Sequence, residues 1–88
     1  MKNVLIEDTA FDDLKFWSKN DIRLLRKILE LIADIRKTPF SGKGKPEALK
    51  YQYKGYWSRR INEEHRIVYR ITDEALVIVS ARFHYKEQ

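Results

Sequence analysis

The chain has 88 residues, a length that suits one small domain and leaves no room for a second. It has no cysteine, which excludes thiolate catalysis, cysteine-bound metals and iron–sulfur clusters. Its composition is 43% hydrophobic and 35% charged, as in a folded globular protein. The apolar runs are too short for a membrane span or a signal peptide. We therefore expect a cytoplasmic protein that makes no membrane contact, with one domain over residues 1–88.

The positive charge is concentrated in one segment. The net charge is +5, and residues 42–70 carry eight Lys or Arg against three acids, while the rest of the chain is balanced. A localised basic surface attracts polyanions, and nucleic acid is the obvious one. The charge pattern alone leaves an alternative open, in which the basic surface serves only to keep the protein soluble.

The first half of the sequence predicts a short strand over 3–6 and two helices. Asp8 or Thr9 is placed to cap the first helix, and Asn20 or Asp21 to begin the second. Thr38-Pro39 should end the second helix, because the residue before proline disfavours the helical conformation. Its predicted buried face repeats at spacings of three and four residues: Ile22, Leu25, Ile28, Leu29, Ile32 and Ile35.

The second half predicts a basic loop over 40–49 and then short strands. These strands are expected near 50–54, 56–62, 65–71 and 75–82. Connections this short hold no crossover helix, so the strands should pair antiparallel. The fold class is therefore α+β, with two N-terminal helices packed on one face of a mainly antiparallel sheet of four to five strands. The other face would stay partly open for a site.

Alternation along the last two strands predicts which side chains share a face. Ile67, Tyr69 and Ile71 fall on one side of their strand. In the next strand, alternate residues from Val77 to Tyr85 share a side. Periodicity leaves open which side meets the helices, and a bulge would reverse the later residues.

Three residue types here suit RNA cleavage without a metal. That reaction needs a base for the 2′-hydroxyl, an acid for the departing 5′-oxygen and a cation for the phosphate. Glu47 stands among lysines that should favour its ionised form, although a glutamate among lysines is more often a surface ion-pair partner. His65 follows Glu63-Glu64 at an expected turn, which favours a structural role, whereas His84 lies almost at the C-terminus.

The remaining basic and aromatic residues are ambiguous. Arg59-Arg60 could clamp a phosphate or form an exposed basic pair. The tyrosines interleaved with cations could stack on bases or belong to the sheet core. The segment GKGKPE is not a phosphate-binding loop, and no compact set of metal ligands is present. The residues alone thus indicate a basic α+β domain that binds RNA or DNA, with cleavage left open.

Several motifs of the chain stand in a characteristic order and spacing: Arg36-Lys37-Thr38-Pro39-Phe40, Gly42-Lys43-Gly44-Lys45-Pro46-Glu47, Leu49-Lys50, Gly55, Trp57-Ser58-Arg59-Arg60-Ile61, Glu64-His65-Arg66, Val68-Tyr69 and His84-Tyr85. In this order and spacing they resemble one known family, the YoeB toxins of the RelE/ParE superfamily. The resemblance spans essentially the whole chain.

The resemblance implies a RelE-like fold, similar to microbial ribonucleases, and the toxin activity of a type II toxin–antitoxin system. The implied reaction is ribosome-dependent endonucleolytic cleavage of mRNA, with no metal or other cofactor. The implied partners are the ribosome with its mRNA and a YefM-type antitoxin, and promoter DNA would be bound only by the toxin–antitoxin complex. Homodimerisation, stoichiometry and codon preference stay open.

The resemblance also implies roles for individual residues. The catalytic set falls on Glu47, Arg66 and His84. The substrate-binding positions fall on Lys43, Lys45, Lys50, Arg60, Glu64 and Tyr85. The chain departs from the family pattern at its end, where Lys86-Glu87-Gln88 follow the His-Tyr pair. The alternatives are a non-enzymatic ParE-like toxin that binds DNA gyrase, for which Glu47 and His84 are not needed, and a plain basic binding module.

Overall fold

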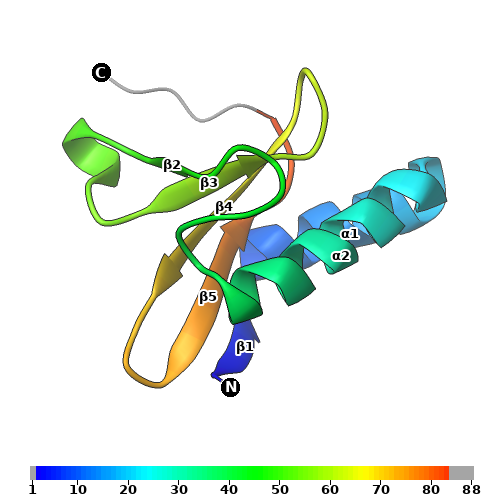
Figure 1. The fold of residues 1–88 in the computed structure, drawn as a ribbon. Helices are drawn as coiled ribbons and strands as arrows, with labels where there is room; N and C mark the ends of the chain where they lie inside the picture. The colour runs from blue at the N-terminus through cyan, green and yellow to red at the C-terminus, as the bar shows by residue number, and fades with distance from the viewer. Residues whose placement is uncertain (1, 84–88) are drawn as a thin grey trace.

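The computed structural model describes residues 2–83, in which two helices lie against one sheet (Figure 1). The sheet has five strands in the order β1-β5-β4-β3-β2. Neighbouring strands pair antiparallel except β1 and β5, which are parallel. The predicted α+β class is confirmed. The elements are β1 (Asn3–Ile6), α1 (Asp8–Asn20), α2 (Ile22–Lys37), β2 (Glu47–Ala48), a 3₁₀ turn (Tyr51–Tyr53), β3 (Trp57–Arg60), β4 (Arg66–Ile71) and β5 (Ala75–Ser80).

The helix boundaries follow local signals in the sequence. Asp21 caps α2, because its carboxylate accepts the backbone N–H of Leu24 at 3.2 Å. Thr38 is the C-cap of α2 and directly precedes Pro39, so the helix ends where predicted. The start of α1 differs from the expectation: Glu7 occupies the cap position without a side-chain hydrogen bond, and Asp8 is already helical. None of the described helices combines the length and apolar character needed to span a membrane.

The core lies between the helices and one face of the sheet. From α2 it takes Ile28, Leu31, Ile32 and Ile35. Two residues that the periodicity assigned to this face, Ile22 and Leu29, are about half exposed, at 49% and 51%. The helix is therefore rotated so that Leu31 takes the buried position. From the sheet the core takes Ile61, Ile67, Tyr69, Leu76, Ile78 and Ala81.

A bulge in β5 changes which residues face the core. Val68 pairs with Ser80 but Tyr69 pairs with Ile78, so Val79 is an extra residue in β5. Ile78 and Ala81 consequently both enter the core, although they are three positions apart. The predicted alternation from Val77 onward is therefore wrong beyond this point.

The expected strand over 50–54 is also wrong. Residues Tyr51–Tyr53 form a 3₁₀ turn in which the N–H of Tyr53 donates to Lys50 O. Tyr51 has a φ of +56°, a conformation that no regular strand contains. The second strand instead lies at Glu47–Ala48, inside the stretch expected to be a loop.

Candidate functional site

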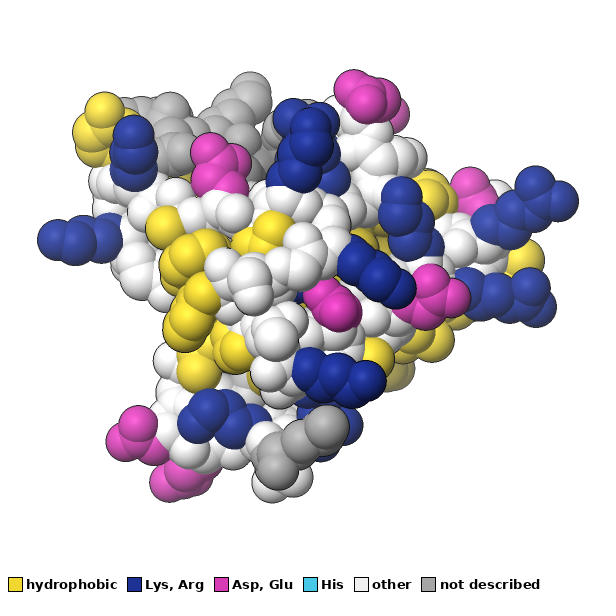
Figure 2. All heavy atoms as spheres, in the orientation of Figure 1, with side chains coloured by type: hydrophobic (Ala, Val, Ile, Leu, Met, Phe, Trp, Pro, Cys, Tyr) yellow, Lys and Arg dark blue, Asp and Glu magenta, His cyan; other side chains and the backbone are white. Residues whose placement is uncertain are grey.

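The register brings charged residues of three strands to the face of the sheet away from the helices. Glu47 in β2 pairs with Ser58 in β3, which pairs with Val68 in β4. Residues that pair directly across strands project from the same face. Arg60 lies two positions after Ser58 and Arg66 two positions before Val68, and the two arginines pair with each other. Because alternate residues of a strand point to the same side, both arginines share the face of Glu47. In the space-filling view, Lys and Arg side chains are spread over the visible surface with single acidic side chains between them (Figure 2).

Arg66 is held by the turn that precedes its own strand. Its side chain is buried, and Nη1 donates to Asn62 O at 2.9 Å and to His65 O at 3.1 Å. A more distant carbonyl, Glu63 O, lies 3.4 Å from the same nitrogen. Three carbonyls thus hold Nη1 of the guanidinium. These bonds orient the cation on the sheet face.

Arg59 takes a role that the sequence reasoning missed. Both alternatives for Arg59-Arg60, a phosphate clamp and an exposed basic pair, are wrong for Arg59, because Arg59 is fully buried while Arg60 is exposed. The Arg59 guanidinium forms an ion pair with Asp34 and donates to the carbonyls of Thr38, Ser41 and Lys43. Alternation was the available signal, since Arg59 shares a side with Trp57 and the neighbouring Arg60 faces the opposite way.

The ion pair makes Asp34 an anchor for the basic loop. The N–H of Lys43 donates to its carboxylate at 3.0 Å, and this bond together with the Arg59 guanidinium lowers the pKa of Asp34. Tyr69 adds a second link, because its hydroxyl accepts from Arg59 Nε at 3.2 Å and donates to Pro39 O at 2.7 Å. Burial raises the pKa of Tyr69, so it remains a neutral donor at physiological pH. The loop that leads to Glu47 is therefore held in place by hydrogen bonds to Asp34, Arg59 and Tyr69.

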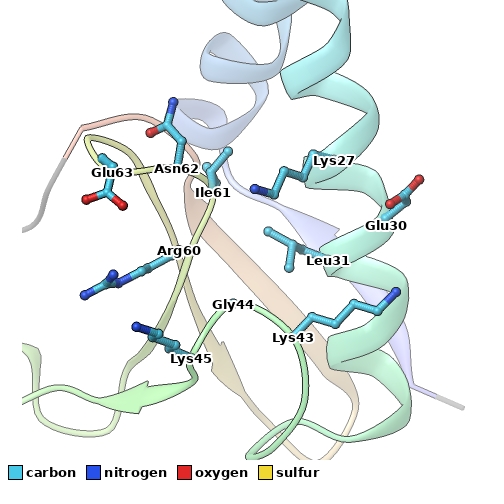
Figure 3. Close-up of a pocket in the computed structure, with 10 residues that line it drawn as sticks. All are labelled: Lys27, Glu30, Leu31, Lys43, Gly44, Lys45, Arg60, Ile61, Asn62 and Glu63. Carbon is cyan, nitrogen blue, oxygen red and sulfur yellow. The ribbon is translucent and has the colours of Figure 1, made fainter.

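Three of the predicted substrate-binding cations line a cavity of about 490 Å³ between α2, the loop and the end of β3. These are Lys43, Lys45 and Arg60, and the cavity wall also includes the apolar side chains of Leu31 and Ile61. Figure 3 shows Arg60 and Lys45 extending away from α2, whereas Lys43 extends toward it. All three cations therefore line the same cavity, but the side chain of Lys43 is directed differently from the other two.

The other predicted site residues lie elsewhere. Lys50 is exposed directly before the 3₁₀ turn. Glu64 is exposed, with its carboxylate 3.7 Å from His65 Nε2. His65 is buried against Trp17, as expected for a structural histidine. His84 and Tyr85 lie outside the described residues. Across residues 2–83, no three His, Cys, Asp or Glu side chains gather where they could hold a metal ion.

Comparison with known proteins places these features in one family. The family profile described as "YoeB-like toxin of bacterial type II toxin-antitoxin system" matches residues 6–85. The chain belongs to the YoeB toxin family. Toxin YoeB of Escherichia coli K12 is 53% identical over 85 residues, which are 97% of this chain and 100% of that protein. Toxin YoeB of Mycobacterium bovis is 46% identical over the same shares of both chains.

Solved structures of YoeB proteins have the same fold as this family member. The YoeB/ParE toxin from Agrobacterium tumefaciens superposes with a TM-score of 0.92 at 46% identity, covering 97% of this chain and 100% of that one. The YoeB dimer from Staphylococcus aureus gives 0.89 at 42% identity, with 96% and 98% covered. YoeB in the heterotetrameric YoeB–YefM complex from Staphylococcus aureus gives 0.86 at 42% identity, with 97% and 99% covered.

Proposed function

We propose that this YoeB-family toxin is a metal-independent endoribonuclease that cleaves mRNA on the ribosome and so inhibits translation. The observation that carries the proposal is the register, in which Glu47, Arg60 and Arg66 share the sheet face away from the helices. A carboxylate and two guanidinium groups on one face suit a phosphodiester, since they supply a base and cations without a bound metal.

The proposed reaction is attack of the 2′-oxygen on the adjacent phosphorus. Glu47 accepts the 2′-hydroxyl proton as the new P–O bond forms. The bond from phosphorus to the 5′-oxygen breaks, and the protonated imidazole of His84 gives its proton to that oxygen. The products are a 2′,3′-cyclic phosphate, or the 3′-phosphate after its hydrolysis, and a 5′-hydroxyl.

The cations stabilise the additional negative charge of the pentacovalent phosphate. Arg66 is suited to this task because its guanidinium is already oriented by three backbone carbonyls and needs little rearrangement. Lys50 and Arg60 assist it, and Lys43 and Lys45 contact the RNA backbone. Glu64 and Tyr85 complete the proposed substrate contacts.

Primer extension on cellular mRNA after expression of the chain tests the proposal. The nuclease predicts new 5′ ends inside translated codons, which disappear when translation is blocked before initiation. A ParE-like gyrase toxin predicts an SOS response with intact mRNA, and a plain binding module predicts neither. Intact mRNA together with arrested growth would contradict the proposed nuclease.

We further propose a YefM-type antitoxin as the inhibitor, with promoter DNA bound only by the complex. The support is that a 42% identical YoeB from Staphylococcus aureus forms a heterotetrameric complex with YefM. The cavity at Lys43 and Lys45 would suit an acidic segment with an apolar anchor, because its lining combines apolar side chains with four cations against two acids, Glu30 and Glu63. We expect the bound antitoxin to mask Glu47, Arg66 and His84. Saturating antitoxin should then abolish cleavage, and undiminished cleavage would contradict this masking.

A further inference from the structure

Ala81, the first residue after β5, is tied to the fold by two side chains of α1. The carboxylate of Asp13 accepts the N–H of Ala81 at 2.9 Å, and Trp17 Nε1 donates to Ala81 O at 2.8 Å. Burial raises the pKa of Asp13, while the N–H of Ala81 acts in the opposite direction. Both polar groups of the Ala81 backbone are therefore used, and the path of the chain after β5 is set by α1.

Phe83 is held in the same way at the start of β4. Its N–H donates to His65 Nδ1 at 2.7 Å, and its carbonyl accepts the N–H of Arg66 at 3.2 Å. The φ of Phe83 is +65°, in the left-handed region that an L-residue with a bulky side chain rarely occupies. Such a conformation is strained and persists only where the surroundings enforce it.

Burial of the Phe83 side chain does not explain why the backbone keeps this strained conformation. It is 55% exposed, although its ring lies 5.7 Å from the His65 ring and beneath the Arg82 guanidinium. The restraint on its backbone therefore comes mainly from the two hydrogen bonds. Of the two, only the bond to His65 uses a side chain, so it can be removed by substitution.

The acceptor atom of His65 is itself fixed. The imidazole is buried, with its ring edge-on to Trp17 at 4.8 Å between centroids. The backbone on either side is anchored as well, because the His65 N–H donates to Asn62 Oδ1 at 2.7 Å and its carbonyl accepts from Ile61 N. Since Nδ1 accepts a hydrogen bond, the ring presents a lone pair there in a fixed direction.

We propose that His65 is a positioning residue for the reaction, which it serves by fixing the backbone of Phe83. His84 is the next residue in the sequence. The bond from Phe83 N–H to His65 Nδ1 fixes the backbone of the residue that directly precedes the proposed general acid in the sequence. The inference rests on the proposed function of His84. A misplacement of about 1 Å of a reacting group can cost 10²-fold in rate, so this bond should affect turnover more than binding.

Two substitutions at the same position separate the acceptor from the ring. His65→Phe keeps an aromatic ring against Trp17 but removes the acceptor, whereas His65→Asn places an amide oxygen near the position of Nδ1 and removes the ring. In ribosome-dependent cleavage assays we expect His65→Phe to lower kcat by about 10- to 100-fold with KM little changed. His65→Asn should restore kcat to within a few-fold of the unsubstituted protein. Amide hydrogen exchange at Phe83 should be fast in His65→Phe and slow in His65→Asn.

A backbone ester at Phe83 provides the same test without altering the core. Semisynthesis can join residues 83–88, starting with the α-hydroxy analogue of Phe83, to residues 1–82. This change removes the N–H donor and leaves His65 in place, so the predicted loss of kcat should appear even where His65→Phe does not fold.

The outcomes distinguish this inference from the proposed function. If His84→Ala is inactive while folded His65→Phe and the ester both keep full kcat, the positioning role is overturned and the nuclease stands. Equal losses in His65→Phe and His65→Asn at equal stability would also overturn it. Full activity of His84→Ala would overturn the proposed mechanism, and the positioning role with it.

Discussion

Arg60 in β3 and Arg66 in β4 are direct partners in the antiparallel register, so two cations project from the same face of the sheet at opposed positions. Like charges at such positions destabilise a sheet, by up to about 1 kcal/mol. The opposed arginines therefore do not stabilise the pairing of the strands, but together they would attract a bound phosphate. The two arginines also differ in their surroundings, because backbone carbonyls hold Arg66 while Arg60 is exposed.

Replacing Arg60 by Gln should therefore separate stability from activity. The free energy of unfolding, measured with urea, should stay constant or rise by up to about 1 kcal/mol, because the repulsion is removed. RNA binding should weaken, and the salt dependence of log K should fall by about one unit, as expected when one phosphate contact is lost. Arg23→Gln, at an exposed position in the first turn of α2, is the matched control and should change neither. Equal RNA affinity in the two variants would argue against a phosphate contact at Arg60.

Asp34→Asn should make the protein less stable at neutral pH and remove part of its sensitivity to acid. The folded-state pKa of Asp34 lies below the ordinary value of 3.8, through its bonds from Lys43 N–H and from Arg59. Its ionised form therefore contributes stability that is fully present above pH 3.8 and is lost as the pH falls through the folded pKa. Hydrogen bonds to charged groups are worth about 1.5–3 kcal/mol, and we expect a loss of this size at pH 7.

Urea unfolding at several pH values checks this prediction. The unsubstituted protein should lose stability from about pH 4 downward, and the difference between it and Asp34→Asn should shrink over the same range. A difference that stays constant down to pH 2 would show that the carboxylate charge is not the source of the stabilisation.

The parts of the fold that depend on neighbours in the sequence were predictable. Asp21 caps α2 through its own carboxylate, and Thr38-Pro39 ends that helix through a steric restriction on adjacent residues. The antiparallel pairing of β3, β4 and β5 followed from short connections. The resemblance to YoeB toxins, which rested on motif order, is confirmed by the family match over residues 6–85.

The parts that depend on packing were not predictable. The bulge at Val79 leaves no local mark in a run of β-branched residues, yet it turns Ala81 into the core. Aromatic residues favour strands, but Tyr51–Tyr53 turn back because Tyr51 takes a positive φ. At the candidate site, alternation places Arg59 and Arg60 on opposite faces of the strand, but the sequence alone could not show which of the two faces the core.

Gly42 and Gly55 form a matched pair for testing how firmly the basic loop is anchored. Both have positive φ, +113° and +94°, so alanine is strained at either position. A Cβ at Gly42 would collide with Asp34 Oδ2 and crowd Arg59 Nη1, whereas a Cβ at Gly55 would meet no atom within 4 Å. Gly55→Ala should cost about 1–2 kcal/mol, the cost of the conformation alone. Gly42→Ala should cost clearly more, because it also disturbs the buried ion pair. Thermal unfolding of the two variants measures the difference, and equal costs would show that the loop moves aside freely.

Glu47→Gln tests the proposed general base with little change in shape. Glu47 is exposed at the start of β2, so the amide should leave the free energy of unfolding nearly unchanged. The single-turnover rate of mRNA cleavage should fall by about 10²–10⁴-fold, because an amide cannot accept the 2′-hydroxyl proton. Glu74→Gln, an exposed acid in the turn between β4 and β5, is the control and should cleave normally. Full activity of Glu47→Gln would remove Glu47 from the mechanism.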